Sequence, residues 1–240
     1  MSLRIAFDLD GVLADMESVL VRQAEVLFGP PLTRRFLEDP VDPAGPLSGA
    51  WANGDGPGGH EDAAAARWRR ATGVRLDIAP PFEKTMTARQ QQALWRHIKG
   101  VENFWETLPE VEPGVVGRLA RLAAERRWET IFLTTRPETA GSTAQDQSRQ
   151  WLTSKGFPLP GVFVVRGSRG RLATDLGLDI VVDDRPENCV DVVADSKARA
   201  VLVWRGDDGV LPVAQRLGIG VVRTTAECLD TLAAMDRPVR

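Results

Sequence analysis

The stretch FDLDGVLAD, residues 7–15, decides how we expect the chain to fold. The residues that lead into it, 3–8, are mostly apolar and predict a short buried strand that ends at Asp8. Gly11 then provides the turn by which the chain leaves the strand. Asp8 and Asp10 therefore stand two residues apart where a strand passes into a turn, so both carboxylates can reach one site.

A regular alternation of segments follows in the second half of the chain. Short apolar runs of strand character are separated by segments with the spacing of amphipathic helices. This alternation predicts an α/β fold, a Rossmann-like parallel sheet with helices on both faces. The predicted strands are 129–134, 161–165, 180–182, 200–204 and 220–222, and the predicted helices are 113–126, 143–155, 170–176, 187–195, 212–217 and 225–235.

The segment between the first strand and this alternation has a different composition. Ten of the 21 residues from 40 to 60 are Gly or Pro, which favours an irregular loop. Helical patterns occur before the loop at 15–27 and after it at 61–71 and 86–99. The predicted domains are a sheet-containing core of residues 1–15 and 111–240 and an inserted, mostly helical domain of residues 16–110.

The composition is typical of a globular protein. Of the 240 residues, 43% are hydrophobic and 26% are charged, and no apolar run approaches the roughly 18 residues of a membrane helix. The first residues lack the apolar stretch of a signal peptide, and the two cysteines, Cys189 and Cys228, are too few for a disulfide framework. A net charge of −3 gives no general attraction to nucleic acid or to lipid. We therefore expect a cytoplasmic protein whose partners include neither a nucleic acid nor a membrane.

Two more of the predicted strands end in polar residues, as the first one does. Thr134 and Thr135, followed by Arg136, come after one strand, and Asp183 and Asp184 come after another. A single Asp at a strand end is commonly only a turn former or a helix cap. Three such clusters at the same edge of a parallel sheet indicate a ligand site, because ligands bind outside the carboxyl ends of the strands.

The residue types in these clusters favour phosphate chemistry. Carboxylates are hard oxygen ligands suited to Mg²⁺, and hydroxyls and N–H groups near a helix start suit a phosphate. The pair of Asp8 and Asp10 permits one carboxylate to act as nucleophile and the other as acid and base. The sequence has neither a Gly-rich phosphate loop nor a Ser-His pair, which removes the main competing phosphoryl and acyl chemistries.

These motifs resemble those of the haloacid-dehalogenase-like (HAD) superfamily. FDLDGVLAD resembles its first motif, DxDGx(T/V), the hydrophobic-Thr-Thr stretch resembles its second, and IVVDDRPEN resembles its fourth. Within the superfamily, the order DLDGVLAD, ENFWETLPEVEPGVVGRLARL, TIFLTTRP and IVVDDRPEN is similar to the 5'(3')-deoxyribonucleotidase group. The resemblance implies Mg²⁺-dependent hydrolysis of small phosphomonoesters through an aspartyl-phosphate, with the inserted domain as a cap.

The resemblance also implies a role for each residue that matches a motif. Asp8 is the expected nucleophile and a metal ligand. Asp10 is expected to protonate the leaving oxygen and then to activate water, with its backbone carbonyl on the metal. The remaining expected roles are a direct metal ligand in Asp184, support of the metal site from Asp183, and binding of the phosphoryl group by Thr134 and Thr135.

The third motif departs from the superfamily pattern, which expects a Lys that neutralises the charge of phosphate and nucleophile. Relatives of the form K-x13-DD place this Lys fourteen residues before the paired aspartates, where this chain has Arg169. We expect Arg169 to bind phosphate, with Arg171 and Lys155 as the other candidates. An Arg keeps the charge but offers a planar fork of donors.

The predicted substrate is a small phosphorylated molecule, with a nucleoside or deoxynucleoside monophosphate as the leading candidate. Phe104 and Trp105 belong to the stretch that leads from the cap back to the core, and its resemblance to the deoxyribonucleotidases implies that one of the rings faces the cleft above Asp8. A base stacked on such a ring would favour a nucleotide over a bare sugar phosphate.

Two other functions remain open at this point. One is a phosphatase for sugar phosphates or other metabolites, and the other is a phosphate- or nucleotide-binding protein without turnover. The intact pair of Asp8 and Asp10 argues against a pure binding protein, because binding needs no acid or base two residues from a nucleophile. It argues equally against dehalogenases of the superfamily, which lack the second Asp.

Overall fold

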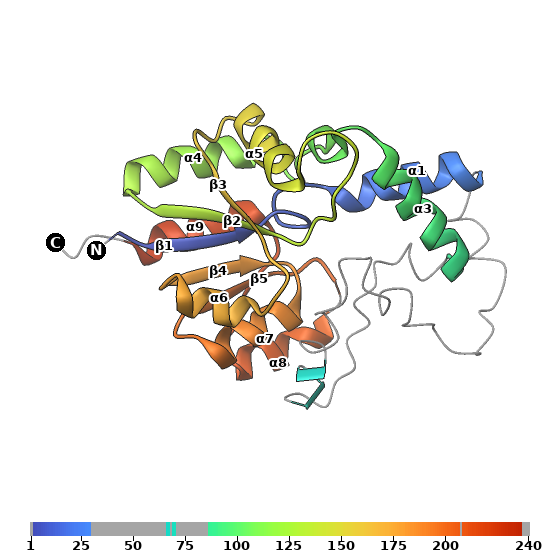
Figure 1. Ribbon diagram of the computed structural model, residues 1–240. Helices are drawn as coiled ribbons and strands as arrows, with labels where there is room; N and C mark the ends of the chain where they lie inside the picture. Colours follow the sequence, from blue (N-terminus) through green and yellow to red (C-terminus); the bar gives the residue numbers. More distant parts are fainter. Residues whose placement is uncertain (1, 30–65, 68, 71–85, 207, 237–240) are drawn as a thin grey trace.

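Six parallel strands form one sheet in the computed structural model, which describes residues 2–29, 66–67, 69–70, 86–206 and 208–236. The order across the sheet is β3-β2-β1-β4-β5-β6 (Figure 1). This confirms the predicted α/β class. The strands are β1 (Arg4–Asp8), β2 (Glu129–Thr134), β3 (Gly161–Val164), β4 (Ile180–Asp183), β5 (Arg199–Val203) and β6 (Gly220–Val222).

Helices cover both faces of this sheet, as the alternation of segments predicts. The helices described between β1 and β2 include α1 (Met16–Phe28), α3 (Ala88–Gly100) and α4 (Val115–Arg126), with a 3-10 turn, η2 (Phe104–Thr107), between α3 and α4. Those that follow β2 are α5 (Ala144–Ser154), α6 (Arg169–Asp175), α7 (Pro186–Asp195), α8 (Leu211–Arg216) and α9 (Thr225–Met235), with a second 3-10 turn, η3 (Asp208–Val210), before α8.

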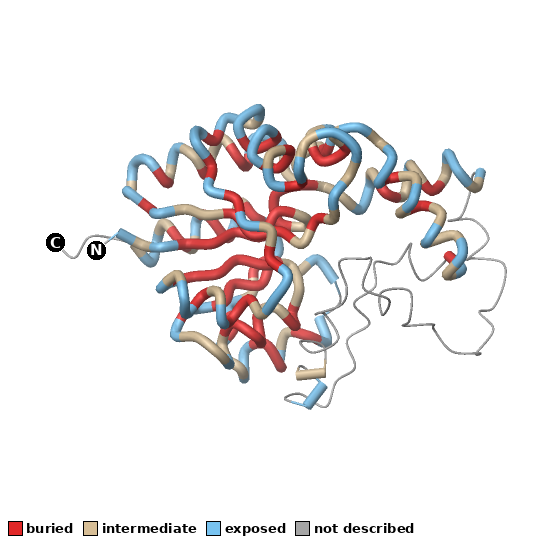
Figure 2. Tube along the Cα trace, viewed as in Figure 1, coloured by how far each residue is buried: buried red, intermediate tan, exposed pale blue. Residues whose placement is uncertain are grey.

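The alternation of side chains along β1 builds two separate cores. Ile5 and Phe7 belong to the core under α4, α5 and α9, whereas Ala6 belongs to the core under α6, α7 and α8. All three side chains are fully buried, because the central strand of a doubly covered sheet meets helices on both sides. Figure 2 shows the buried residues along the strands and on the inner sides of the helices.

The first part of the predicted insertion packs as a helix pair beyond the carboxyl ends of the strands (Figure 1). Leu20 and Ala24 of α1 and Leu94 and Ile98 of α3 are buried in one shared core. The Gly/Pro-rich stretch 40–60 and most of the helical pattern at 61–71 lie outside the described residues, so the division into core and cap stays a prediction. None of the helices in the described part of the chain is long and apolar enough to cross a membrane.

Candidate active site

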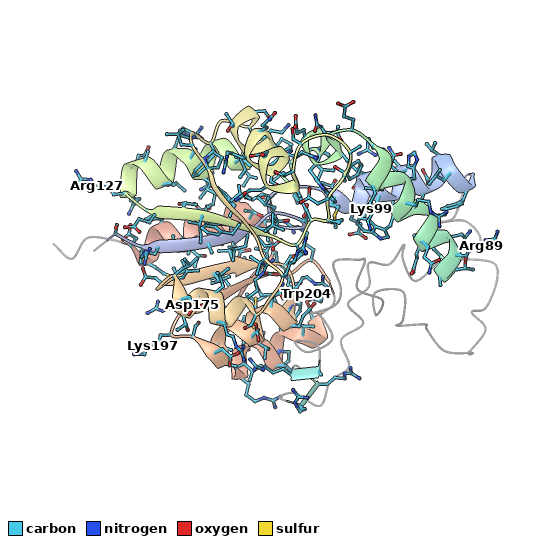
Figure 3. The ribbon with its side chains drawn as sticks, in the orientation of Figure 1. Arg89, Lys99, Arg127, Asp175, Lys197 and Trp204 are labelled. Atoms are coloured by element: carbon cyan, nitrogen blue, oxygen red, sulfur yellow. The ribbon has the colours of Figure 1, made fainter. Side chains whose placement is uncertain are left out.

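The candidate site lies where three neighbouring strands end at the same edge of the sheet. β1 stands between β2 and β4, so its last residue, Asp8, lies between the strand ends at Thr134 and Asp183. Figure 3 shows Arg127, Asp175 and Lys197 at the opposite edge, where strands begin. The next two strands in the chain are added on one side of β1 and the last three on the other, which makes this edge a topological switch point, where open α/β sheets bind ligands.

Arg169 is the cation that the fold brings to Asp8. Its Nη2 donates to Oδ1 of Asp8 at 2.7 Å, and its Nε lies 3.7 Å from Oδ2 of Asp183. Ser168 caps α6 by accepting a hydrogen bond from the N–H of Arg171, which starts the helix at Arg169. The side chain of Arg169 is only 4% exposed, yet its Nη1 has no hydrogen-bond partner. Arg169 therefore has one guanidinium nitrogen bound to Asp8 and another, Nη1, that is buried without a partner.

The two other third-motif candidates lie in different surroundings. Arg171 is exposed on the first turn of α6, and Lys155 is half-buried at the carboxyl end of α5. The structure therefore brings Arg169 to Asp8 and leaves Arg171 on the surface.

Asp8 belongs to a buried cluster of carboxylates that repel one another. Burial raises its pKa well above the usual range, Asp183 raises it further, and Arg169 offsets part of this effect. The pKa of Asp184 is also well above its usual range, because of burial first and then the charge of Asp183, with Arg185 opposing. Both pKa values stay raised although Arg169 and Arg185 oppose the rise, so the cluster would gain from a further cation.

Asp183 and Asp184 have different partners although they are adjacent. Asp183 is fully buried and accepts hydrogen bonds from Nδ2 of Asn188, at 3.1 and 3.0 Å, and from the backbone N–H of Arg185, at 2.9 Å. Asp184 is half-buried and lies against the loop after β1. Its Oδ2 would be 1.9 Å from a Cβ atom placed on Gly11, whose φ of +81° also favours glycine. Glycine at this position is therefore what lets the Asp184 carboxylate lie against the loop after β1.

A metal ion would meet few side-chain ligands here. Within the described residues, no group of three or more His, Cys, Asp or Glu side chains is arranged to hold a metal. Mg²⁺ nevertheless binds through only one or two carboxylates and keeps other positions for water and phosphate oxygens. The donor set of Asp8, Asp184 and the backbone carbonyl of Asp10 fits that requirement, and their buried charge favours a divalent cation.

Arg136 is a part of the site to which the sequence analysis gave no role. Its Nε and Nη2 hold the carboxylate of Asp10, at 2.9 Å from Oδ2 and 2.7 Å from Oδ1 respectively. The side chain of Arg136 is 0% exposed and that of Asp10 is 16% exposed. The sequence signal was an Arg directly after the Thr-Thr pair at a strand end, but nothing in it indicated where so long a side chain would turn.

Thr134 lies beside the same pair of residues. It is fully buried, its hydroxyl accepts the N–H of Arg136 at 3.1 Å, and it lies 3.5 Å from Oδ2 of Asp10. Thr135 follows it and is half-buried. The structure thus brings both residues to the strand end next to Asp8, with the Thr134 hydroxyl already engaged by protein groups.

The expectation that Phe104 or Trp105 faces the cleft is wrong. The residues are 2% and 0% exposed and pack edge to face, with their ring centroids 5.0 Å apart. The indole N–H of Trp105 donates to the carbonyl of Pro137 at 2.9 Å, and its backbone N–H donates to Gln147. These contacts fix η2 beneath the loop that follows β2, because a buried indole needs a partner for its N–H. Both rings belong to the buried core and offer no surface for a nucleobase, and Trp105 packs against the guanidinium of Arg136 that holds Asp10.

The comparisons with known proteins bear on the fold. No family model and no curated protein matches the sequence. Among solved structures, a "putative beta-phosphoglucomutase" from Thermotoga maritima has a TM-score of 0.51 at 20% identity, covering 97% of this chain and 99% of that one. A haloacid dehalogenase-like family hydrolase from Xanthomonas campestris has a TM-score of 0.49 at 16% identity, covering 98% of each chain. A 2-haloacid dehalogenase from Pseudomonas syringae has a TM-score of 0.48 at 15% identity, covering 98% of this chain and all of that one.

The first of these structures shows that the chain has the HAD-like fold, which the motifs implied. The narrower likeness to the deoxyribonucleotidases gains no support from these structures or from the buried rings of Phe104 and Trp105.

Proposed function

We propose that the protein hydrolyses small phosphomonoesters, with Asp8 as the nucleophile. The contact that carries this proposal is that of Arg169 with Asp8, because Nη1 of the same guanidinium is buried without an acceptor. A buried donor without a partner is unfavourable, and a phosphoryl oxygen placed against Asp8 would supply the missing acceptor. A guanidinium fork suits this task, since it can bind a carboxylate and a phosphate oxygen together.

The proposed reaction has two steps that share Asp10. In the first, an Asp8 oxygen forms a bond to phosphorus, the bond from phosphorus to the leaving oxygen breaks, and the Asp10 carboxyl gives its proton to that oxygen. In the second, a water oxygen forms a bond to phosphorus, Asp10 takes the water proton, and the bond to Asp8 breaks. Inorganic phosphate and an alcohol leave, and both aspartates return to their first states.

Mg²⁺ is the proposed cofactor. Asp8, Asp184 and the backbone carbonyl of Asp10 would hold it, and Asn188 would keep Asp183 oriented beside them. The ion would supply positive charge that neutralises the carboxylates and the phosphate as they approach each other. Thr134 and Thr135 are proposed to contribute to phosphate binding at the end of β2.

The substrate class is proposed to be sugar phosphates or other small metabolites rather than nucleotides. The aromatic platform expected from the nucleotidase resemblance is buried, so the observation that favoured a nucleobase is gone. The similar structure from Thermotoga maritima bears the name "putative beta-phosphoglucomutase", and a phosphoglucose belongs to this substrate class. Asp10 favours phosphate chemistry over dehalogenation, since its proposed work is to protonate an alkoxide and to activate water.

The test is a screen of the purified full chain for release of inorganic phosphate. The panel contains sugar phosphates, ribonucleotides and deoxyribonucleotides, with Mg²⁺ or with a chelator, and a 2-haloacid is assayed separately for halide release. We expect Mg²⁺-dependent phosphate release that Asp8→Asn abolishes. Halide release, equal turnover by Asp8→Asn, or phosphate binding without any turnover would overturn the proposal.

A further inference from the structure

The guanidinium of Arg136 is held from every side. Its Nη1 donates to Oγ of Ser148 at 2.9 Å, and its Nε and Nη2 take the two oxygens of Asp10. Its carbon Cζ lies 5.0 Å from the ring centroid of Trp105 and 5.9 Å from that of Trp151. Two rings, a hydroxyl and a carboxylate therefore leave this fork little freedom to turn.

Fold stability alone is a weak reason for such an arrangement. An ion pair with one partner at 0% exposure loses hydration that its mutual attraction only partly returns, and apolar side chains of similar size often serve stability as well or better. The surroundings of Arg136 instead fix the orientation of its guanidinium group. Both donors point at the carboxylate two residues from the nucleophile position, and this bidentate contact defines the plane of that carboxylate.

We propose that Arg136 is a positioning residue that fixes the carboxyl group of Asp10 for both proton transfers. This inference rests on the proposed function and deepens it. A carboxyl group that gives its proton to the leaving oxygen, and later takes one from water, must meet two different oxygens from one place. Geometric errors on the order of 1 Å at such groups cost about 10²-fold in rate. The fixed fork of Arg136 would prevent the Asp10 side chain from rotating away between the two steps.

Two substrates with different leaving groups separate positioning from a general structural effect. Nitrophenolate leaves without receiving a proton, whereas the alkoxide of glycerol phosphate must receive one. The value of kcat/KM reports the steps up to departure of the leaving group, and kcat also includes hydrolysis of the aspartyl-phosphate. We expect Arg136→Met to lower kcat/KM for glycerol phosphate about 10²-fold, the cost of a misplaced group. For nitrophenyl phosphate we expect kcat/KM to change much less and kcat to fall, because water attack still needs Asp10.

A double-mutant cycle gives the second readout. The readout is kcat/KM for glycerol phosphate, which each single variant should lower far more than twofold. If Arg136 acts through Asp10, then adding Arg136→Met to Asp10→Asn should change this kcat/KM by no more than about twofold. Arg136→Lys keeps the charge but not the fork and should fall between Arg136→Met and the parent. It also replaces Arg136→Met in every comparison if thermal melting shows that Arg136→Met does not fold.

Gln147→Met is the matched control. Gln147 is fully buried near Arg136 and is hydrogen-bonded to Trp105 and Thr139, but no hydrogen bond joins it to Asp10 in the described structure. Gln147→Met should lower kcat/KM for both substrates by the same factor. Equal losses of kcat/KM on both substrates in Arg136→Met, or a further large loss in the Asp10→Asn background, would overturn this inference alone. A parent protein that hydrolyses neither of these two esters nor any phosphomonoester of the panel would overturn the proposed function and this inference with it.

Discussion

The Nη1 atom of Arg67 lies 2.8 Å from Oδ1 of Asp191, and the same nitrogen lies 2.7 Å from Oδ2 of Asp195. Arg67 comes from the predicted cap, and both carboxylates belong to α7 of the core. The second oxygen of Asp191 accepts the hydroxyl of Ser168 at 2.5 Å and the N–H of Gly170 at 3.2 Å. The Asp191 carboxylate thus joins a residue of the predicted cap to the start of α6, where Arg169 lies.

The first prediction concerns this connection. Arg67→Met should raise KM several-fold and leave kcat nearly unchanged, because it frees the segment without touching the strand ends. The free energy of unfolding should fall by less than about 1 kcal/mol, since the Arg67 side chain is 35% exposed and water screens the pair. Arg69→Met, two residues away and exposed, is the control. A KM equal to that of the parent, at low and at high salt, would count against the connection.

Arg169 should matter far more than its neighbour Arg171. Arg169→Met removes the cation beside Asp8 and should lower kcat/KM about 10²- to 10³-fold, the usual cost of losing one donor to a developing anion. Arg169→Lys should recover part of the loss, because it restores the charge without the fork. Arg171→Met removes an exposed Arg two residues further along α6, and steady-state kinetics should show the parent's rate within error. Similar losses of kcat/KM in Arg169→Met and Arg171→Met would show that Arg169 has no specific role in the proposed site.

Asp8→Asn should change how stability depends on pH. Burial and Asp183 raise the pKa of Asp8 in the folded protein, so its stabilising contribution is complete below the ordinary value of 3.8 and is lost as the pH rises through the raised value. The Asn variant has no such loss. In chelator, its free energy of unfolding should therefore exceed that of the parent by a margin that grows with pH. Urea unfolding at about pH 5 and about pH 8 measures the margin, and a margin that narrows at the higher pH would contradict the prediction.

Two glycines with almost the same φ separate backbone strain from the approach of Asp184. Gly11 and Gly114 have φ of +81° and +79°, but a Cβ on Gly114 would meet nothing within 4 Å. Each Ala variant should lose about 1 kcal/mol or more of stability from the backbone alone. Only Gly11→Ala should also displace the Asp184 carboxylate. Thermal melting with and without Mg²⁺ should show a metal-dependent rise in Tm for Gly114→Ala and none for Gly11→Ala. The same Mg²⁺-dependent rise in Tm in both variants would show that Asp184 is not needed for metal binding.

Strand ends are visible in a sequence, and this explains which parts of the site were predicted. A doubly covered strand is a short apolar run, so the residue where polarity begins marks the carboxyl edge of the sheet. Asp8, Thr134 and Asp183 were placed in this way, and the structure brings all three to one edge. The strand and helix pattern after residue 113 followed from the same apolar periodicity.

Side chains that act across several segments could not be placed from the sequence. The direction of Arg136 depends on Trp105 in η2 and on Ser148 in α5, which no local pattern connects. The two aromatic residues of η2 were misplaced for a related reason. A ring that packs beneath a loop and a ring that faces a cleft have the same sequence pattern. Only the hydrogen bond from the indole N–H of Trp105 to the carbonyl of Pro137, which joins two separate segments, distinguishes them.

The central position of β1 has a consequence for how the protein would acquire its proposed activity. Arg4 pairs with Glu129, Ile5 pairs with Ile180, and Asp8 meets Arg169 at a separation of 161 residues along the chain. Contacts this distant in sequence form slowly, because a long loop must close before they yield any stabilisation. During synthesis β1 emerges first and keeps both edges unpaired until β2 and β4 follow, which makes it the segment most exposed to wrong pairing. A functioning Asp8 is therefore among the last products of folding, and turnover would report that the sheet has closed on both sides of its central strand.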